Sequence, residues 1–242
     1  MARARQIVAF GGGGFSMEAG NGLLDAYVLT ATGARRPRVC FLPSASGDAD
    51  HYVVRFYRHF AAGRCEPSHI SLFRRDCGVS DLRAHLLAQD LVYVGGGSVI
   101  SLLGVWRAHG LDHVLREAWE AGVVMCGLSA GSLCWFAEGM TAFHGESHPV
   151  EGLGLLPCSN AVHYDKEPER RPAYRAAVAG GMVAGYAADD GAALHFVGTE
   201  LARAVSSRCG AQAYRVEAVA GEVVELPLRV DYLGEPAVEL VA

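Results

Sequence analysis

Short apolar runs alternate with amphipathic stretches through the first half of the chain. The runs of strand-like length are Gln6 to Phe10, Arg38 to Leu42, Ile70 to Phe73, Asp90 to Val94 and Val123 to Gly127. Apolar residues recur at helical spacing over Ala49 to Ala62, Asp81 to Gln89, Val99 to Arg107 and Leu111 to Glu120. Strands and helices that alternate in this way predict an α/β fold with a doubly wound, mostly parallel sheet flanked by helices.

The pattern changes after residue 139. Residues 139 to 157 read as a loop, and a helix is predicted from Pro172 to Ala179. Short strands are then predicted at Tyr186 to Ala188, Ala192 to Val197, Ala202 to Ser206, Ala213 to Val219 and Glu222 to Pro227. Because no linker rich in Pro, Gly or Ser precedes them, we expect antiparallel additions to the same sheet, and a single domain over residues 1 to 242.

Composition narrows the class of protein. The chain has 242 residues, 51% hydrophobic and 19% charged, with a formal charge of −5, which favours a compact globular protein without a basic surface for nucleic acid or for a membrane. No apolar run reaches the length of a membrane span or of a signal-peptide core, so a cytoplasmic location is expected. The seven cysteines include no C-x-x-C pair and predict neither a metal site nor a disulfide framework.

The strand that ends at Gly127 leads into a turn with small residues on both sides of a serine. Residues 127 to 131 read GLSAG, and an apolar, helix-like stretch follows. A sharp turn from strand to helix leaves no room for side chains at Gly127 or Gly131, and it exposes the hydroxyl of Ser129 beside backbone N–H groups at a helix start. The stretch therefore predicts a nucleophile elbow.

A run of four glycines, Gly11 to Gly14, follows the first predicted strand. It does not complete the G-x-G-x-x-G pattern of a dinucleotide-binding turn, so no cofactor is predicted. We expect instead a loop that other segments approach closely.

A serine nucleophile requires a general base. Of the ten histidines, His163 is the first candidate because it ends a short apolar run in the loop-rich region after Ser129. His195, inside the predicted strand Ala192 to Val197, is the alternative.

Four motifs in order resemble the peptidase E family, which includes cytoplasmic aspartyl dipeptidases and, more distantly, cyanophycinases. They read VYVGGGS, GLSAGSLCWF, HYDKEPERRPAYR and GYAADDGAALHFVG. The resemblance extends from the GGGGF loop to about Val216, and it implies a fold like that of class I glutamine amidotransferases.

The resemblance implies roles for single residues. Ser129 would be the nucleophile and His163 the general base, and the oxyanion hole would use backbone N–H groups of the Gly95–Gly97 loop and of Ala130. Family members that act on Asp-X dipeptides bind the substrate's side-chain carboxylate with an arginine soon after the histidine, where this chain has Arg170 and Arg171. No cofactor is implied, the partner is a small peptide substrate, and a homodimer is left open.

Two positions depart from the family pattern. Ser98 follows the glycine triplet, where an Asn is common, and would alter hydrogen bonding to substrate. The family's triad is taken to run Ser, acid, His, yet no aspartate occurs from Gly127 to Tyr164. The acid from this interval must then be a glutamate, with Glu146 preferred over Glu138, and Glu151 also available; Asp189 or Asp190 from the later strand stays open.

The sequence thus predicts a serine exopeptidase that hydrolyses short peptides, with dipeptides and an N-terminal Asp as the expected substrates. One alternative is an esterase-type α/β-hydrolase that uses Ser129 and His195. A glutamine amidotransferase is disfavoured because its elbow nucleophile is a cysteine. A third alternative is a binding protein that retains the pocket without a working triad.

Overall fold

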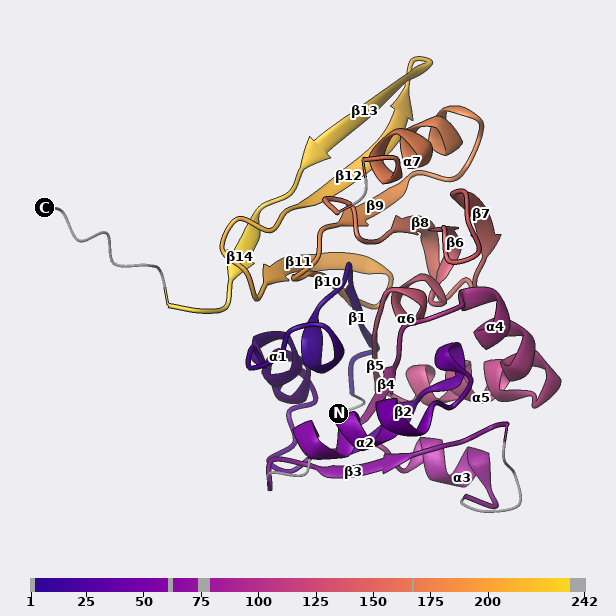
Figure 1. The fold of residues 1–242 in the computed structure, drawn as a ribbon, viewed down its shortest axis with the longest axis vertical. Helices are drawn as coiled ribbons and strands as arrows, with labels where there is room; N and C mark the ends of the chain where they lie inside the picture. Colours follow the sequence, from indigo (N-terminus) through magenta and orange to yellow (C-terminus); the bar gives the residue numbers. More distant parts are fainter. Residues whose placement is uncertain (1–2, 61–62, 74–78, 167, 236–242) are drawn as a thin grey trace, which may run out of the picture.

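An eight-stranded, mostly parallel sheet forms the base of the molecule in the computed structural model, which describes residues 3–60, 63–73, 79–166 and 168–235 (Figure 1). Its strands are β1 (Gln6–Phe10), β2 (Arg38–Leu42), β3 (Glu66–His69), β4 (Leu91–Val94), β5 (Val124–Leu128), β10 (Ala192–Val197), β11 (Glu200–Ser206) and β14 (Val230–Tyr232). The order is β14-β11-β10-β1-β5-β4-β2-β3. Strands β1 to β5 pair in parallel, whereas β10 lies antiparallel to both β1 and β11.

Helices cover both faces of this sheet because successive strand residues point to opposite sides. Val8 packs in one core with Phe56 and other residues of α1 (Leu23–Ala31) and α2 (Asp50–Phe60). Ile7 packs in the opposite core with Trp106, on the side of α3 (Leu82–Leu87), α4 (Val99–Ala108) and α5 (Leu111–Glu120). The predicted doubly wound arrangement is confirmed.

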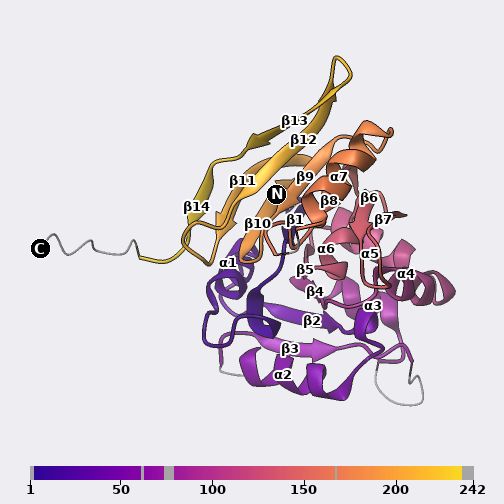
Figure 2. The same cartoon turned by 45° about the horizontal axis from the view of Figure 1, so that its top comes forward.

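A second sheet of six strands rises above the carboxyl ends of the first (Figure 2). Its strands are β6 (Phe136–Thr141), β7 (His148–Glu151), β8 (Leu156–Ala161), β9 (Gly185–Ala188), β12 (Ala213–Val219) and β13 (Glu222–Pro227). The order is β13-β12-β9-β8-β6-β7, and α7 (Arg170–Ala179) packs against it through Tyr174 and Val178. Phe136 and Leu156 share a core with Ile7, so the two sheets are packed together.

This second sheet is the main departure from the sequence prediction. Residues 139 to 157, expected to be a loop, contain β7 and parts of β6 and β8. Their segments, FAEGMT and HPVE, include Gly, Pro and Glu, which weaken a strand signal. The later strands also divide between the sheets, since β10 and β11 join the first as antiparallel strands and β9, β12 and β13 join the second. Alternation of apolar residues cannot identify the sheet a strand will join.

Two boundaries also differ. The strand expected at Ile70–Phe73 lies earlier, at β3, whose sequence EPSH has little apolar character; the buried side chains of Ile70 and Leu72 that produced the signal follow the strand. The helix expected over Ala49–Ala62 is α2, and residues 61–62 lie outside the described residues.

None of the helices formed by the described residues combines the length and the apolar character needed to span a bilayer.

Candidate active site

The chemically important loops leave the carboxyl ends of three neighbouring parallel strands. The glycine run follows β1, the Gly95–Gly97 loop follows β4, and Ser129 follows β5. In the sheet order β1-β5-β4, the strand that carries Ser129 lies between the other two. Ligand sites in open α/β sheets form at this edge, so the topology by itself gathers these loops around Ser129.

Ser129 occupies the turn between β5 and the four-residue helix α6 (Ala130–Leu133). Its backbone has φ 53° and ψ −115°, a conformation that non-glycine residues seldom adopt. A Cβ at Gly127 would lie 2.3 Å from the carbonyl oxygen of Gly131, and one at Gly131 would lie 2.4 Å from that of Val94. The expected collision of side chains with neighbouring backbone is therefore confirmed at both glycines.

His163 reaches Ser129 from the second sheet. It comes two residues after β8 ends, with φ 54°, and its backbone N–H donates to the carbonyl of Gly11 over 3.0 Å. Its Nε2 lies 2.9 Å from Ser129 Oγ. The structure therefore brings together the two residues that the sequence singled out as nucleophile and base.

Asp190 holds the other ring nitrogen of His163. Its Oδ1 lies 2.5 Å from Nδ1, and its Oδ2 lies 3.3 Å from the ammonium of Lys166. The backbone N–H of Asp190 donates to Asp165 Oδ1 over 2.9 Å. A Cβ at Gly12 would lie only 2.0 Å from Asp190 Oδ1, so the glycine run provides the space that this carboxylate occupies, as expected of a closely approached loop.

The charges around Asp190 favour its ionised form. Burial alone raises the pKa of a carboxyl group, but the hydrogen bonds and charges of His163 and Lys166 outweigh burial and lower the pKa of Asp190. A carboxylate on Nδ1 orients the imidazole and leaves Nε2 free to accept the proton of Ser129.

The expected glutamates lie elsewhere, which corrects the choice of acid. Glu146 is exposed in the loop between β6 and β7, where its backbone carbonyl is 3.0 Å from His148 Nδ1. The Glu138 carboxylate accepts the N–H of Val183 over 2.8 Å. Glu151 is exposed at the end of β7. The family order Ser, acid, His places the acid before the histidine, whereas Asp190 follows β9 of the second sheet and comes after the histidine in the chain.

The backbone N–H groups expected to bind an oxyanion are only partly available. The N–H of Gly96 donates to Tyr52 Oη over 3.2 Å, so this group is already engaged. Gly97, with φ 140°, and Ala130, the first residue of α6, border the pocket beside Ser129. Their two N–H groups are the donors that this arrangement can aim at a developing oxyanion.

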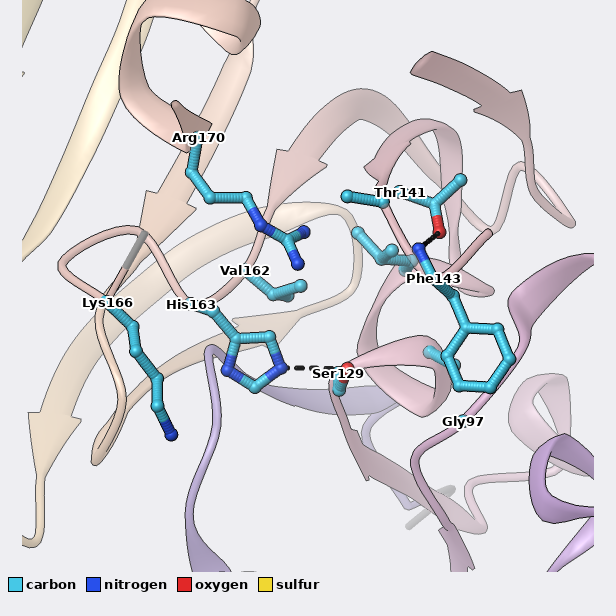
Figure 3. A pocket seen from close by; sticks show the side chains of 11 residues that line it. Gly97, Ser129, Thr141, Phe143, Val162, His163, Lys166 and Arg170 are labelled. Carbon is cyan, nitrogen blue, oxygen red and sulfur yellow. Dashed lines mark hydrogen bonds between the residues drawn. The ribbon is translucent and has the colours of Figure 1, made fainter. Parts of the chain in front are cut away.

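A pocket of about 210 Å³ opens next to Ser129, and two cationic side chains line it. Figure 3 shows Arg170 extending its guanidinium toward Val162 and His163, with the Lys166 side chain on the far side of the imidazole. Arg171 points away from the pocket: it pairs with Glu225 and lies over the rings of Tyr164 and Tyr214. Of the two arginines expected to contact substrate, only Arg170 lines the pocket.

Ser98 supports the site rather than lining the pocket. Its Oγ accepts the N–H of Ser101 at the start of α4 and lies 2.9 Å from His144 Nε2. His144 belongs to the loop between β6 and β7 and stacks edge to face with Phe143, whose ring borders the pocket. The expectation that Ser98 contacts substrate is thus replaced by a link from α4 to this loop.

Both ring nitrogens of His195 are engaged by residues other than Ser129. Nδ1 lies 2.6 Å from Tyr27 Oη and Nε2 lies 3.0 Å from Gln6 Oε1, and the ring is buried within β10. Burial, helped by the charge of Arg203, lowers the pKa of His195. The contacts that the structure gives His195 therefore do not support the esterase alternative.

The sequence predicted no role for Lys166, only a close approach of other segments for the run that contains Gly12, and only a secondary place for Asp190. The sequence nevertheless contains a signal that could have singled out Lys166 and Asp190. Lys166 is the only lysine in the sequence, three residues after the candidate base, and Asp190 is the second residue after the predicted strand Tyr186 to Ala188. Among the residues that the structure describes, no group of three or more His, Cys, Asp or Glu side chains is placed to hold a metal ion.

The family and the relatives that this chain resembles are peptidases. The profile of peptidase family S51 matches residues 7–204. The chain is 51% identical over 231 residues to the "Uncharacterized peptidase YgaJ" of Bacillus subtilis (strain 168), covering 95% of this chain and 100% of that protein. It is 31% identical over 159 residues to "Peptidase E" of Streptomyces coelicolor, covering 63% of each chain.

Solved structures show the same fold. A peptidase from an acI-B1 Actinobacterium superposes with a TM-score of 0.67 at 16% identity, covering 93% of this chain and 95% of the other. A putative peptidase E protein from Listeria monocytogenes EGD-e gives a TM-score of 0.54 at 14% identity, covering 93% and 100%. With the profile spanning most of the sequence, the chain belongs to peptidase family S51, the peptidase E family, and is a peptidase.

Proposed function

We propose that this peptidase is a serine exopeptidase that hydrolyses short peptides, dipeptides with an N-terminal Asp above all, by means of Ser129, His163 and Asp190. The observation that carries the proposal is the continuous contact from Ser129 Oγ to His163 Nε2, at 2.9 Å, and from His163 Nδ1 to Asp190 Oδ1. A serine, a histidine and a carboxylate in this geometry are the machinery of acyl transfer.

The proposed reaction has two stages. Ser129 Oγ attacks the scissile carbonyl carbon while His163 Nε2 takes the hydroxyl proton, and the N–H groups of Gly97 and Ala130 stabilise the oxyanion. The C–N bond then breaks as His163 returns the proton to the leaving amine. Water, deprotonated by His163, hydrolyses the acyl-enzyme and frees Ser129.

The preference for an acidic first residue is inferred from the charge of the pocket. Arg170 is largely buried, and Lys166 lies at the mouth of the same pocket of about 210 Å³. The guanidinium of Arg170, with the Lys166 ammonium that pairs with Asp190 beside it, favours a carboxylate on the residue that becomes the acyl group. The small volume favours a short side chain such as that of Asp.

A panel of Asp-Ala, Glu-Ala, Asn-Ala and Ala-Ala tests the proposal with the wild type, Ser129→Ala and Arg170→Met. We expect cleavage of Asp-Ala that Ser129→Ala abolishes, and an Arg170→Met variant that loses about tenfold or more in kcat/KM on Asp-Ala, the value of one charge-assisted contact, but little on Ala-Ala. Binding without Ser129-dependent cleavage anywhere in the panel would contradict the proposal and favour the non-catalytic alternative. Equal cleavage of Asp-Ala and Ala-Ala would contradict only the preference.

A further inference from the structure

A second pocket, of about 360 Å³, opens on Ser129 from the side of α2. It shares Gly97, Ser129, Phe143 and His163 with the pocket of Arg170 and Lys166, so the reactive serine lies between the two. A peptide bond held at Ser129 would therefore extend its two halves into different pockets.

The far wall of this second pocket is one face of α2. His51, Tyr52 and Arg55 line it, and the spacing between His51 and Arg55 places them one helical turn apart. The Tyr52 hydroxyl, which accepts the N–H of Gly96, ties this face to the loop beside Ser129. The wall is therefore fixed relative to the reacting serine.

Arg55 is positioned by the backbone and keeps donors for a ligand. Its Nη1 donates to the carbonyl of Ser16 over 2.8 Å, which uses one of the five N–H donors of a guanidinium. The side chain is exposed, as is that of His51. Among the lining residues in the described part of the chain, none is an Asp or a Glu, so the pocket offers a ligand cationic and neutral groups only.

We propose that the second pocket receives the leaving residue of the substrate and that Arg55, with His51 beside it, binds the free C-terminal carboxylate of that residue. This inference rests on the proposed function, in which the acyl residue occupies the pocket of Arg170. His163 lines both pockets, and it must donate a proton to the leaving amine, so the leaving residue has to start beside it.

Such a contact would make Arg55 a specificity-determining residue for substrate length. In a dipeptide the carboxylate lies on the leaving residue itself, within the second pocket. In a tripeptide a neutral peptide group takes that place and the carboxylate moves one residue further on. A guanidinium binds a carboxylate through paired, charge-assisted hydrogen bonds, which a neutral amide cannot replace.

The test compares the best-cleaved dipeptide of the panel with its C-terminal amide. For the wild type we expect kcat/KM to be at least about tenfold higher on the free acid than on the amide, as for one charge-assisted contact. Arg55→Met should bring this ratio close to one by slowing cleavage of the acid only, and Arg55→Lys should restore part of it. Arg58→Met, which removes an exposed arginine of α2 that does not line the pocket, is the matched control and should keep the wild-type ratio.

A binding measurement separates recognition from catalysis. The Ser129→Ala protein should bind the dipeptide more tightly than its amide, and adding Arg55→Met should remove this difference. The inference is overturned if Arg55→Met keeps the wild-type ratio, or if it lowers the preference for an acidic first residue instead. Hydrolysis that survives Ser129→Ala would overturn the proposed function itself, so the two failures are distinguishable.

Discussion

The Nδ1 atom of His163 lies 2.5 Å from Oδ1 of Asp190, a residue 27 positions later in the chain. The contact joins the end of β8 to the segment between β9 and β10, over the glycine run that follows β1. Activity should therefore depend on Asp190 and on the groups that surround it, Lys166 and Gly12.

Asp190→Asn should lower kcat by about 10²- to 10⁴-fold, because an amide holds the imidazole in a different tautomer and does not stabilise the imidazolium. Glu146→Gln is the matched control, since Glu146 is exposed on the loop between β6 and β7. Steady-state kinetics on the best dipeptide would check both variants. Loss of activity in Glu146→Gln together with retention in Asp190→Asn would contradict the assignment.

Lys166→Met should lower kcat/KM by about threefold to fivefold, since the lysine is largely exposed and its pairing with Asp190 is screened by solvent. The loss should shrink as salt is raised, because added ions screen the same interaction. Lys166→Arg should retain most of the activity.

Because Lys166 is the only lysine in the sequence, its role can also be tested by chemical modification. An amine-acetylating reagent should reduce activity of the wild type, and substrate should protect against it, because Lys166 lines the pocket. Lys166→Arg leaves only the N-terminal amine to react, so it should resist inactivation. Equal inactivation of both proteins would show that the effect does not arise at Lys166.

Gly12→Ala should reduce kcat by about 100-fold or more while the protein stays folded. The added Cβ would lie 2.0 Å from Asp190 Oδ1 and 2.9 Å from His163 Cε1, so the carboxylate must move off the imidazole. Gly104→Ala is the control, because a Cβ there meets nothing within 4 Å on helix α4. It should leave activity unchanged and raise the free energy of unfolding by about 0.5–1 kcal/mol.

The neighbouring aspartates should have opposite effects on the pH dependence of stability. Burial, with the nearby charges of Asp165 and Asp190, raises the pKa of Asp189 from 3.8 to about 6 despite the N–H that Gln212 donates to it. The folded protein then holds this proton more tightly than the unfolded chain, so the contribution of Asp189 to stability is lost as the pH rises from 3.8 to about 6.

Asp189→Asn keeps an acceptor for the N–H of Gln212 and removes that loss. Its free energy of unfolding in urea should exceed that of the wild type by roughly 1 to 3 kcal/mol at pH 7.5, from 1.36 kcal/mol per pKa unit, and the difference should shrink toward zero as the pH falls below 3.8. Asp190→Asn should show the reverse sign, because the lowered pKa of Asp190 stabilises the fold at neutral pH and this stabilisation is lost as acid protonates the carboxylate. Coincident urea curves for Asp189→Asn and the wild type at pH 7.5 would contradict the first expectation.

The local geometry of Ser129 could be predicted from sequence because its cause is local. Gly127 and Gly131 are required wherever a strand turns sharply into a helix, and the apolar strands around them have a clear period. The role of His163 as general base was predicted from its position after an apolar run and from the resemblance to the peptidase E family. These are features that a short stretch of sequence contains.

The sequence could not predict in the same way which acid contacts His163 or which arginine lines the pocket. Whether Asp190 or Glu146 meets His163 depends on how β6, β8 and β9 pair, and these short strands carry no pairing information in their apolar pattern. Arg170 and Arg171 are adjacent in sequence, yet they point to different partners because successive helix residues are about 100° apart around the axis of α7. Sequence places both in the right region, and only the packing of α7 assigns one to the pocket.

The central claim is that Ser129 is the nucleophile, and covalent trapping tests it most directly. A fluorophosphonate should react with the wild type to give one adduct by intact-mass analysis, located by peptide mapping at Ser129 and concomitant with loss of peptidase activity. Ser129→Ala should give no adduct and no hydrolysis, and His163→Ala should react far more slowly. An adduct at another residue, or an Ser129→Ala protein that still cleaves the dipeptide, would contradict the claim.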